Sequence, residues 1–366
     1  MPEYDELSRP RRPRRPRRSP FMRFLRFLGR SLAVILLTAL VFSVFVVAVC
    51  GVLTLGPSER ARELFVLSVT ESSALKFVPH IYLPEETVES ILHPVREEQQ
   101  PDSFREIGYE TVSDEPETVE EPGELVVIDE THLHDEIEII DIRKSTFKGK
   151  MMIIHDPSRV IVGTLSSYGG SGWYLKDFVS RYNAVAGTNA GSFVDPDGQG
   201  TGGIPDGLVM RDGKIDYGSA GVTYSGVLGF DANHILHVGT MSGQEALDLG
   251  LVTAVSFPPG PTLIQNGVKF KNLGGGYNPR TCVGQRADGA VLLVVIEGRH
   301  PDSIGATYDD LAELMEEYGA VNAGNLDGGS SSAMIYLGEQ ITKGSNLIGS
   351  RPICTAILVL GEGEEN

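Results

Sequence analysis

Residues 281–296 read TCVGQRADGAVLLVVI, two apolar runs joined by Asp288-Gly289. Asp-Gly between apolar runs predicts a β-hairpin, because glycine accepts the positive φ that a tight turn needs. Apolar runs also flank Asp212-Gly213, Asp231-Ala232-Asn233 and Asp156-Pro157. These segments together predict a domain that is rich in hairpins and built mainly on antiparallel sheets.

Two amphipathic helices are expected in the same part of the chain. Residues 175–182 and 311–318 each carry apolar side chains at i, i+3, i+4 and i+7, which makes one apolar stripe on a helix. Thr307 with Asp310 resembles a capping box before the second helix, and Gly319 is suited to end it. Both stripes are expected to face the core, and the fold class is therefore α+β, with mainly antiparallel sheets and a few packed helices.

An uncharged apolar segment, Leu32–Leu55, precedes this domain. It exceeds the ~20 residues that a helix needs to cross a bilayer. Residues 1–30 contain ten Arg against three acidic residues, so we expect this side to stay cytoplasmic and the C-terminal domain to be extracytoplasmic. The alternative is a cleaved signal peptide, whose apolar core is usually only ~7–15 residues and precedes a small-residue cleavage site.

The charge of the chain is divided unevenly along its length. The segment 1–30 is +7, and subtraction from the total of −18 leaves −25 for the remainder. An acidic body repels phosphate backbones, which excludes nucleic-acid binding by the body. The expected order is a basic cytoplasmic tail with access to membrane lipid (1–31), a transmembrane helix (32–55), a partly helical, acidic and partly disordered spacer (56–138), and a globular domain (139–362).

The cysteine and histidine residues predict neither a disulfide framework nor a metal site. Three cysteines are too few for a disulfide framework, and Cys282 and Cys354 are expected as buried core residues, with a bond between them left open. His132 and His134 beside Asp135 have no further ligand pattern nearby, so a solvated surface is expected there.

Polar residues gather at the ends of apolar runs in four segments, 187–193, 278–281, 297–299 and 325–332. Acidic and basic residues at strand ends, beside glycines that let a ligand approach the backbone, suit a binding or catalytic site. The Gly-rich stretches of the chain match neither the phosphate-binding loop nor the dinucleotide fingerprint. The four segments are therefore the candidate site.

Five motifs follow one another in order along the domain. They are TNAGSF (188–193), GPTLIQNG (260–267), NPRT (278–281), NLDGG (325–329) and Arg351-Pro352 before the apolar run 355–360. Together they resemble the phosphodiester glycosidase family from Ile139 to Leu360. Many bacterial members of this family are labelled exopolysaccharide-biosynthesis proteins. The chain departs from the family pattern at Glu297, where Asp is usual, at Ser330, where a third Gly or a small residue is usual, and at 189–192, where Asn-Gly-Gly-Phe is common.

The resemblance implies a hydrolase that cleaves the glycosidic bond of a sugar-1-phosphodiester, in cell-envelope or exopolysaccharide metabolism. It implies that Arg280 and Arg299 bind the phosphate, while Asp327 acts as base or nucleophile. Glu297 would be the partner carboxylate, or would hold an Arg or a metal ion. The expected substrate-binding residues are Asn189, Thr281, Asn325, Gly328, Gly329, Asn346 and Arg351. No spacing demands a cofactor, although clustered oxygens are able to hold Ca²⁺ or Mg²⁺.

Two other functions remain open from the residues alone. A non-catalytic envelope protein that binds or assembles carbohydrate would use the same pocket to hold polysaccharide or a lipid-linked sugar phosphate. A structural anchor for a partner would use only the tail and the spacer, and it leaves the four polar segments unexplained.

Overall fold

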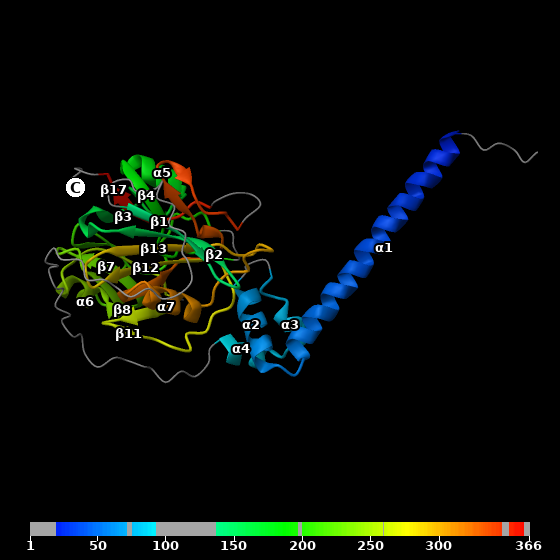
Figure 1. The fold of residues 1–366 in the computed structure, drawn as a ribbon, viewed down its shortest axis with the longest axis horizontal. Coiled ribbons are helices and arrows are strands. Elements are labelled where there is room, and N and C mark those ends of the chain that lie inside the picture. Colours follow the sequence, from blue (N-terminus) through cyan, green and yellow to red (C-terminus); the bar gives the residue numbers. More distant parts are fainter. Residues whose placement is uncertain are drawn as a thin grey trace, which may run out of the picture. The chain divides into compact units, whose positions relative to one another are not determined.

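The computed structural model describes residues 20–71, 75–92, 137–196, 200–258, 260–345 and 351–361. The chain divides into two compact units, Met1–Pro57 and Ser58–Asn366. In the first unit the helix α1 (Pro20–Leu55) contains the predicted apolar segment (Figure 1). Within it, Phe27–Leu55 is long and apolar enough to cross a membrane, a property that a signal sequence shares. The direction of crossing stays a prediction.

The second unit contains three sheets, and every strand pair in them is antiparallel among the described residues. The first sheet has the order β1 (Ile137–Arg143), β2 (Lys148–Ile154), β13 (Val291–Ile296), β12 (Arg280–Arg286), β14 (Ala320–Leu326), β10 (Thr262–Gln265) and β11 (Val268–Lys269). The second has the order β16 (Glu339–Gln340), β15 (Met334–Tyr336), β4 (Ala184–Asn189), β17 (Thr355–Leu360) and β3 (Val160–Thr164). The third has the order β6 (Lys214–Tyr217), β5 (Val209–Arg211), β9 (Leu251–Ser256), β7 (Thr223–Asp231) and β8 (Leu236–Ser242).

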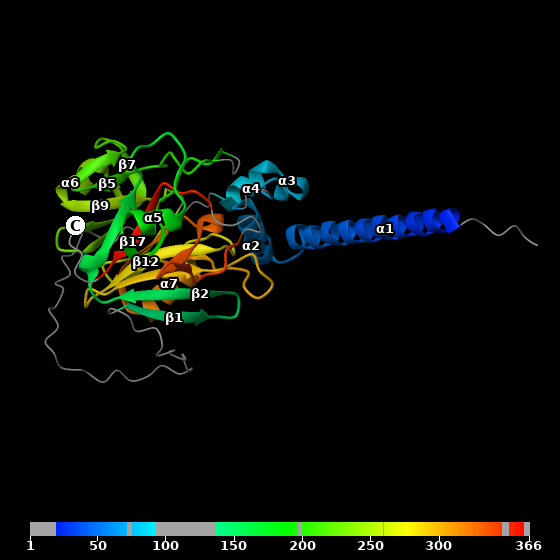
Figure 2. The same cartoon turned by 90° about the horizontal axis from the view of Figure 1, so that it is seen from above.

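Six helices accompany these sheets in the described part of the second unit: α2 (Glu59–Thr70), α3 (Pro79–Tyr82), α4 (Glu85–Leu92), α5 (Leu175–Arg181), α6 (Gly243–Asp248) and α7 (Tyr308–Glu317). The predicted capping box of α7 is present, since the Thr307 hydroxyl accepts from the Asp310 N–H while the Asp310 carboxylate accepts from the Thr307 N–H. The helices α2, α3 and α4 lie together beside the sheets in both views (Figure 2). The predicted α+β class with mainly antiparallel sheets is confirmed.

Three of the hairpin predictions are confirmed and one is wrong. The strands β12 and β13, β5 and β6, and β7 and β8 pair across the predicted turns. The runs Lys150–Ile154 and Val160–Gly163, which flank Asp156-Pro157, do not pair, because β2 joins the first sheet and β3 the second. The chain passes between the sheets through a short 3₁₀ turn, Pro157–Arg159, and the Arg159 Nε donates to the Leu360 carbonyl of β17. The strand β3 pairs with β17, so a long-range pairing rather than a local turn decides its place.

The core is arranged on both faces of the first sheet. In β13, Val291, Leu293 and Val295 pack between the sheets, while the alternate residues pack under α7. A strand covered on both faces must be apolar throughout, which explains the continuous run in the sequence. Separate clusters join α5 to the second sheet and α6 to the third.

The cysteines play no linking role in the described structure. Cys282 and Cys354 are free and buried, and they lie in different core clusters. The bond between them that the sequence left open is therefore not formed, as expected for two core residues. His132, His134 and Asp135 lie outside the described residues.

Candidate functional site

Strand register brings the charged residues of separate motifs to one edge of the first sheet. Arg280 opens β12 and pairs with the last residue of β13, and the next residue of β12 pairs with the last residue of β14. Arg299 and Asp327 follow the ends of β13 and β14. Because neighbouring strands are antiparallel, the start of β12 and the ends of the other two strands share one edge. Three segments far apart in the chain thus meet there.

A pocket of about 320 Å³ opens at this edge. Its lining residues are Glu71, Phe193, Asp195, Phe257, Asn278, Arg280, Arg299, Tyr308, Asp327, Gly328, Gly329, Ser330, Ser331 and Arg351. Of the four residues predicted to converge, Arg280, Arg299 and Asp327 line this pocket and Glu297 does not. The Glu297 Oε1 instead accepts the N–H of Lys343, at 2.7 Å. The expectation of a four-residue cluster is corrected in this respect: Glu297 is not part of the pocket wall.

Asp327 occupies a constrained position in the pocket. Its N–H donates to the Ala190 carbonyl at 2.9 Å, and its own carbonyl accepts from the Asn189 Nδ2 at 2.5 Å. Burial raises the pKa of its carboxyl group from 3.8 to about 6, against the opposing effects of a hydrogen bond from Ser331 and the charge of Arg351. A carboxyl group with this pKa exchanges protons near neutral pH, which suits general acid–base or nucleophilic chemistry.

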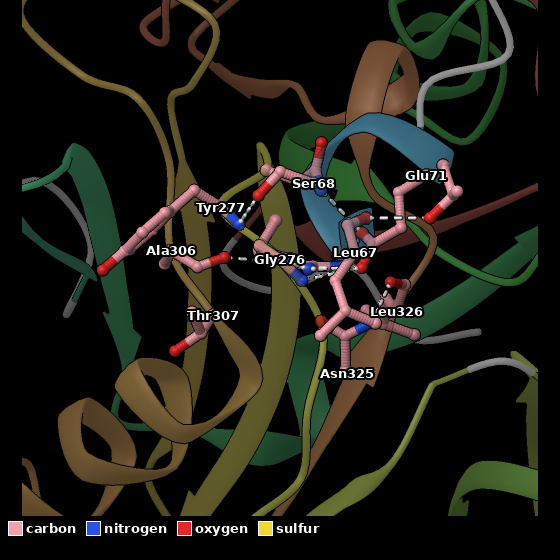
Figure 3. Close-up of polar contacts among 12 residues, drawn as sticks. Leu67, Ser68, Glu71, Gly276, Tyr277, Ala306, Thr307, Asn325 and Leu326 are labelled. Carbon is pink, nitrogen blue, oxygen red and sulfur yellow. Dashed lines mark hydrogen bonds and ion pairs between the residues drawn. The ribbon is translucent and has the colours of Figure 1, made fainter. Parts of the chain in front are cut away.

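Several predicted substrate-binding residues lie behind the pocket wall. Asn189 and Thr281 are 1% and 0% exposed, and the Thr281 hydroxyl donates to the Asn189 Oδ1. Asn325 is fully buried, and its Nδ2 donates to the Leu326 carbonyl (Figure 3). These side chains do not line the pocket, so the structure does not place them in direct contact with a substrate. Asn189 holds the backbone of Asp327 instead. Asn346 lies outside the described residues.

Gly328 and Gly329, which are predicted to bind substrate, form part of the pocket wall. A Cβ at Gly328 would lie 2.8 Å from the Pro279 carbonyl oxygen, closer than real Cβ contacts allow. The Gly329 N–H donates to that same oxygen at 2.9 Å. The Asp-Gly-Gly sequence is therefore more than a tight turn, since it lets the start of β12 press against the segment that carries Asp327.

The Arg280 guanidinium is largely enclosed. Arg280 is 3% exposed, and its Nε and Nη2 donate to the carbonyls of Ala306 and Gly276. The guanidinium carbon lies 4.0 Å from the centroid of the Tyr308 ring, and Nη1 lies 2.8 Å from the Glu71 Oε2. Arg280 therefore lines the pocket with most of its donors already engaged.

The side chains of Arg299 and Arg351 are more exposed than that of Arg280. Arg299 has a φ of +61°, which is unusual for a residue with a side chain and is typical of functional sites. Burial lowers the pKa of its guanidinium, the charge of Arg280 acts in the same direction, and Glu71 opposes the change. Arg351 donates to the Asp195 Oδ2 at 2.7 Å and lies over the Phe193 ring.

Sequence reasoning missed several lining residues. Asp195 is a second pocket carboxylate, and its pKa is held below the usual value chiefly by its hydrogen bond from Arg351. Two carboxyl groups whose pKa values are moved in opposite directions are a common arrangement in acid–base chemistry. Asp195 lies two residues after the end of the TNAGSF motif, and this proximity was available as a signal. Glu71 and Tyr308 gave none, because their neighbours looked like an ordinary helix end and helix start.

The described residues contain no cluster of side chains that would hold the Ca²⁺ or Mg²⁺ ion considered from the sequence. Among residues 20–71, 75–92, 137–196, 200–258, 260–345 and 351–361, no three His, Cys, Asp or Glu side chains gather as ligands would. The carboxylates that line the pocket are Glu71, Asp195 and Asp327, and the first two are each paired with an arginine.

Residues 182–360 match the family model described as phosphodiester glycosidase. This segment belongs to the phosphodiester glycosidase family. The family that the motifs suggested is thereby confirmed for this segment. Glu71 lies outside the matched segment, whereas the other lining residues of the pocket lie within it.

Two known proteins give the measure of the similarity. The SPbeta prophage-derived uncharacterized protein YomE of Bacillus subtilis is 31% identical over 150 residues, which are 37% of this chain and 22% of that protein. The chain thus matches less than a quarter of this curated relative. The catalytic domain of zebrafish N-acetylglucosamine-1-phosphodiester α-N-acetylglucosaminidase, auto-inhibited by its pro-peptide, is 22% identical, with a TM-score of 0.51. That match covers 65% of this chain and 87% of the zebrafish domain, and it shows that the phosphodiester glycosidase segment shares its fold.

Proposed function

We propose that this protein hydrolyses the glycosidic bond of a sugar-1-phosphodiester in the pocket described above. One observation carries the proposal: Asp327, with its raised pKa, shares a pocket with Arg299 and Arg351. All three residues lie within the matched family segment. The zebrafish enzyme of similar fold bears the name of a sugar-1-phosphodiester, which supports the same substrate class here.

The charges of the pocket suit the bond to be cleaved. A phosphodiester carries one negative charge and is a fair leaving group, so stabilising its charge matters more than protonating it. Guanidinium groups bind phosphate oxygens in bidentate geometry, and Arg299 and Arg351, which line the pocket, would do so here. Asp327 then acts at the sugar C1, either as nucleophile or by accepting a proton from the attacking water. The C1–O bond breaks through an oxocarbenium-like transition state, and its electron pair leaves with the phosphate.

The cellular setting is part of the same proposal. The apolar helix α1 anchors the protein in a membrane, with the Arg-rich tail in contact with anionic lipid on the cytoplasmic side. The C-terminal domain then acts outside the cytoplasm, on cell-envelope or exopolysaccharide material of a bacterium. Support comes from the length of α1 and the charge asymmetry of the sequences around it.

The test is an assay of the full chain in detergent against a panel of glycosyl phosphodiesters. The panel begins with an N-acetylglucosamine-1-phosphodiester, and release of reducing sugar is measured. Wild-type protein is expected to turn over at least one compound. Asp327→Asn is expected to reduce kcat/KM by at least about 10³-fold, as removal of a catalytic group typically does. Activity of Asp327→Asn equal to wild type would remove Asp327 from the mechanism.

A second function is favoured by one observation, the pairing of Asp195 with Arg351. If that pair is permanent, the pocket has a single available carboxylate and would hold a sugar phosphate without cleaving it. Saturable binding of the panel compounds without any turnover would establish this carbohydrate-binding function in place of hydrolysis.

A further inference from the structure

A helix from outside the family segment reaches the pocket. The helix α2 ends at Thr70, and the next residue, Glu71, extends a side chain that is 28% exposed toward the start of β12. Its carboxylate accepts from the Arg280 Nη2 at 3.1 Å and the Gly276 N–H at 3.1 Å through Oε1. Through Oε2 it meets the Arg280 Nη1 at 2.8 Å and accepts from the Asn278 Nδ2 at 2.8 Å. Four donors thus converge on one carboxylate.

Residues of α2 and of the loop before β12 both contribute to the contact between them. The Ser68 hydroxyl oxygen accepts the N–H of Tyr277 at 2.8 Å, and Figure 3 shows the two residues side by side. A Cβ at Gly276 would lie only 2.1 Å from the Ser68 backbone nitrogen. Only glycine therefore allows the loop before β12 to meet the last turn of α2. This close fit fixes where Glu71 stands.

Glu71 determines which way the Asn278 amide points. A carboxylate only accepts hydrogen bonds and a guanidinium only donates them. Because the Asn278 nitrogen faces Glu71, its oxygen faces the other way, where it accepts from the Arg299 Nη2 at 3.2 Å. Two consecutive hydrogen bonds therefore connect Glu71 to Arg299 through Asn278. Without the carboxylate, only the hydrogen bond from the Arg299 Nη2 remains to hold the amide in that orientation.

Glu71 also balances the charge of Arg280. Two guanidinium groups close together repel each other, and the charge of Arg280 lowers the pKa of Arg299 while that of Glu71 raises it. With Arg280 paired to Glu71 and Arg351 paired to Asp195, Arg299 is the lining guanidinium without a carboxylate partner among the described residues. The pocket stays open with Glu71 in its wall, so the carboxylate borders the cavity rather than filling it.

We propose that Glu71 is a positioning residue of this pocket: through Asn278 and Arg280 it presents Arg299 to the anionic part of the substrate. The helix α2 directly follows the apolar helix in the chain, and it then holds a residue that acts in the site. The proposal rests on the proposed function in one respect, namely that the anionic group is a phosphodiester.

Binding of dimethyl phosphate to the full chain in detergent tests this without requiring hydrolysis. Phosphorus NMR line broadening is titrated for wild type, Glu71→Ala, Glu71→Gln and the control Glu63→Gln, which makes the same chemical change at an exposed position of α2. We expect at least tenfold weaker binding for Glu71→Ala, about fivefold weaker binding for the isosteric Glu71→Gln, and no change for Glu63→Gln. The fluorescence of Trp173 shows whether each variant is folded. If Glu71→Ala is not folded, the binding measured for Glu71→Gln tests the proposal.

With a hydrolysable substrate the expected change is a higher KM, with kcat kept within about threefold, because Arg299 is misplaced but Asp327 is not. A partly unfolded sample would lower the apparent kcat and leave KM unchanged. Unchanged or tighter binding of dimethyl phosphate by both Glu71 variants would overturn the proposal, and tighter binding would make Glu71 a competitor of the substrate anion. Wild-type binding without any turnover would refute hydrolysis alone and leave the role of Glu71 standing.

Discussion

Asp327→Asn is expected to stabilise the folded protein while it abolishes activity. Burial raises the pKa of the Asp327 carboxyl group from 3.8 to about 6, so folding favours the protonated form. The stability that this group contributes is fully present below pH 3.8 and is lost as the pH rises through about 6. An asparagine has no charge to lose or gain, and it resembles the protonated acid in size and in its hydrogen-bonding oxygen.

The magnitude follows from the two pKa values. One pKa unit corresponds to about 1.4 kcal/mol, so ionised Asp327 destabilises the fold by about 3 kcal/mol at pH 8. At pH 5 the folded protein keeps most of this carboxyl protonated, and the penalty falls to about 1.5 kcal/mol. Asp327→Asn should therefore exceed wild type in unfolding free energy by up to about 3 kcal/mol at pH 8 and by about half of that at pH 5.

Denaturant unfolding of the full chain in detergent measures this difference. Trp173 is the single tryptophan of the sequence, and its ring packs 5.1 Å from that of Phe178, so its fluorescence reports the C-terminal domain. The control is Asp212→Asn, at an exposed turn whose φ of +52° asparagine accepts equally well, and it should show no such gain. If Asp327→Asn is less stable than wild type at pH 8, the burial argument for its pKa is wrong.

Three further outcomes are expected. The kcat/KM of wild type should rise about tenfold per pH unit below about pH 6 and level off above it, since Asp327 acts ionised; a fall through that pH would make Asp327 an acid instead. Gly276→Ala should lose about 1–3 kcal/mol of stability in thermal unfolding because its Cβ meets Ser68, whereas Gly170→Ala, with open space around it, should not. Asn189→Ala should lower unfolding free energy by about 1–3 kcal/mol and reduce activity, because it leaves the Asp327 carbonyl unpaired; a stable and fully active variant would contradict that role.

Local patterns were the reliable part of the prediction. The hairpins at Asp212-Gly213 and Asp288-Gly289 depend on turn residues and on the strands directly beside them, and both are confirmed. The two amphipathic helices and the capping box at Thr307 depend on neighbours within a few residues. The turn at Asp156-Pro157 fails because the next strand is selected by contacts some two hundred residues away, at Leu360.

The candidate site was predicted in part for the same reason. Arg280, Arg299 and Asp327 meet because their strands pair, and the motifs marked where those strands begin and end. Glu297 was wrongly expected in the pocket wall because sequence does not say which way a side chain turns after a strand. Its N–H still pairs with the Lys148 carbonyl of β2, and its side chain is held by the Lys343 N–H.

The amino-acid sequence alone determined the apolar helix, the hairpins, the helix caps and the family, since each is written in residues that lie close together or in a fixed order. Tertiary structure alone decided which charges share the pocket, why Asp327 has a raised pKa, and that Glu71 belongs to the site. Burial and ion pairing depend on distance in space, and the contact between Glu71 and Arg280 spans 209 residues of chain. No pattern of neighbouring residues encodes a contact of that length.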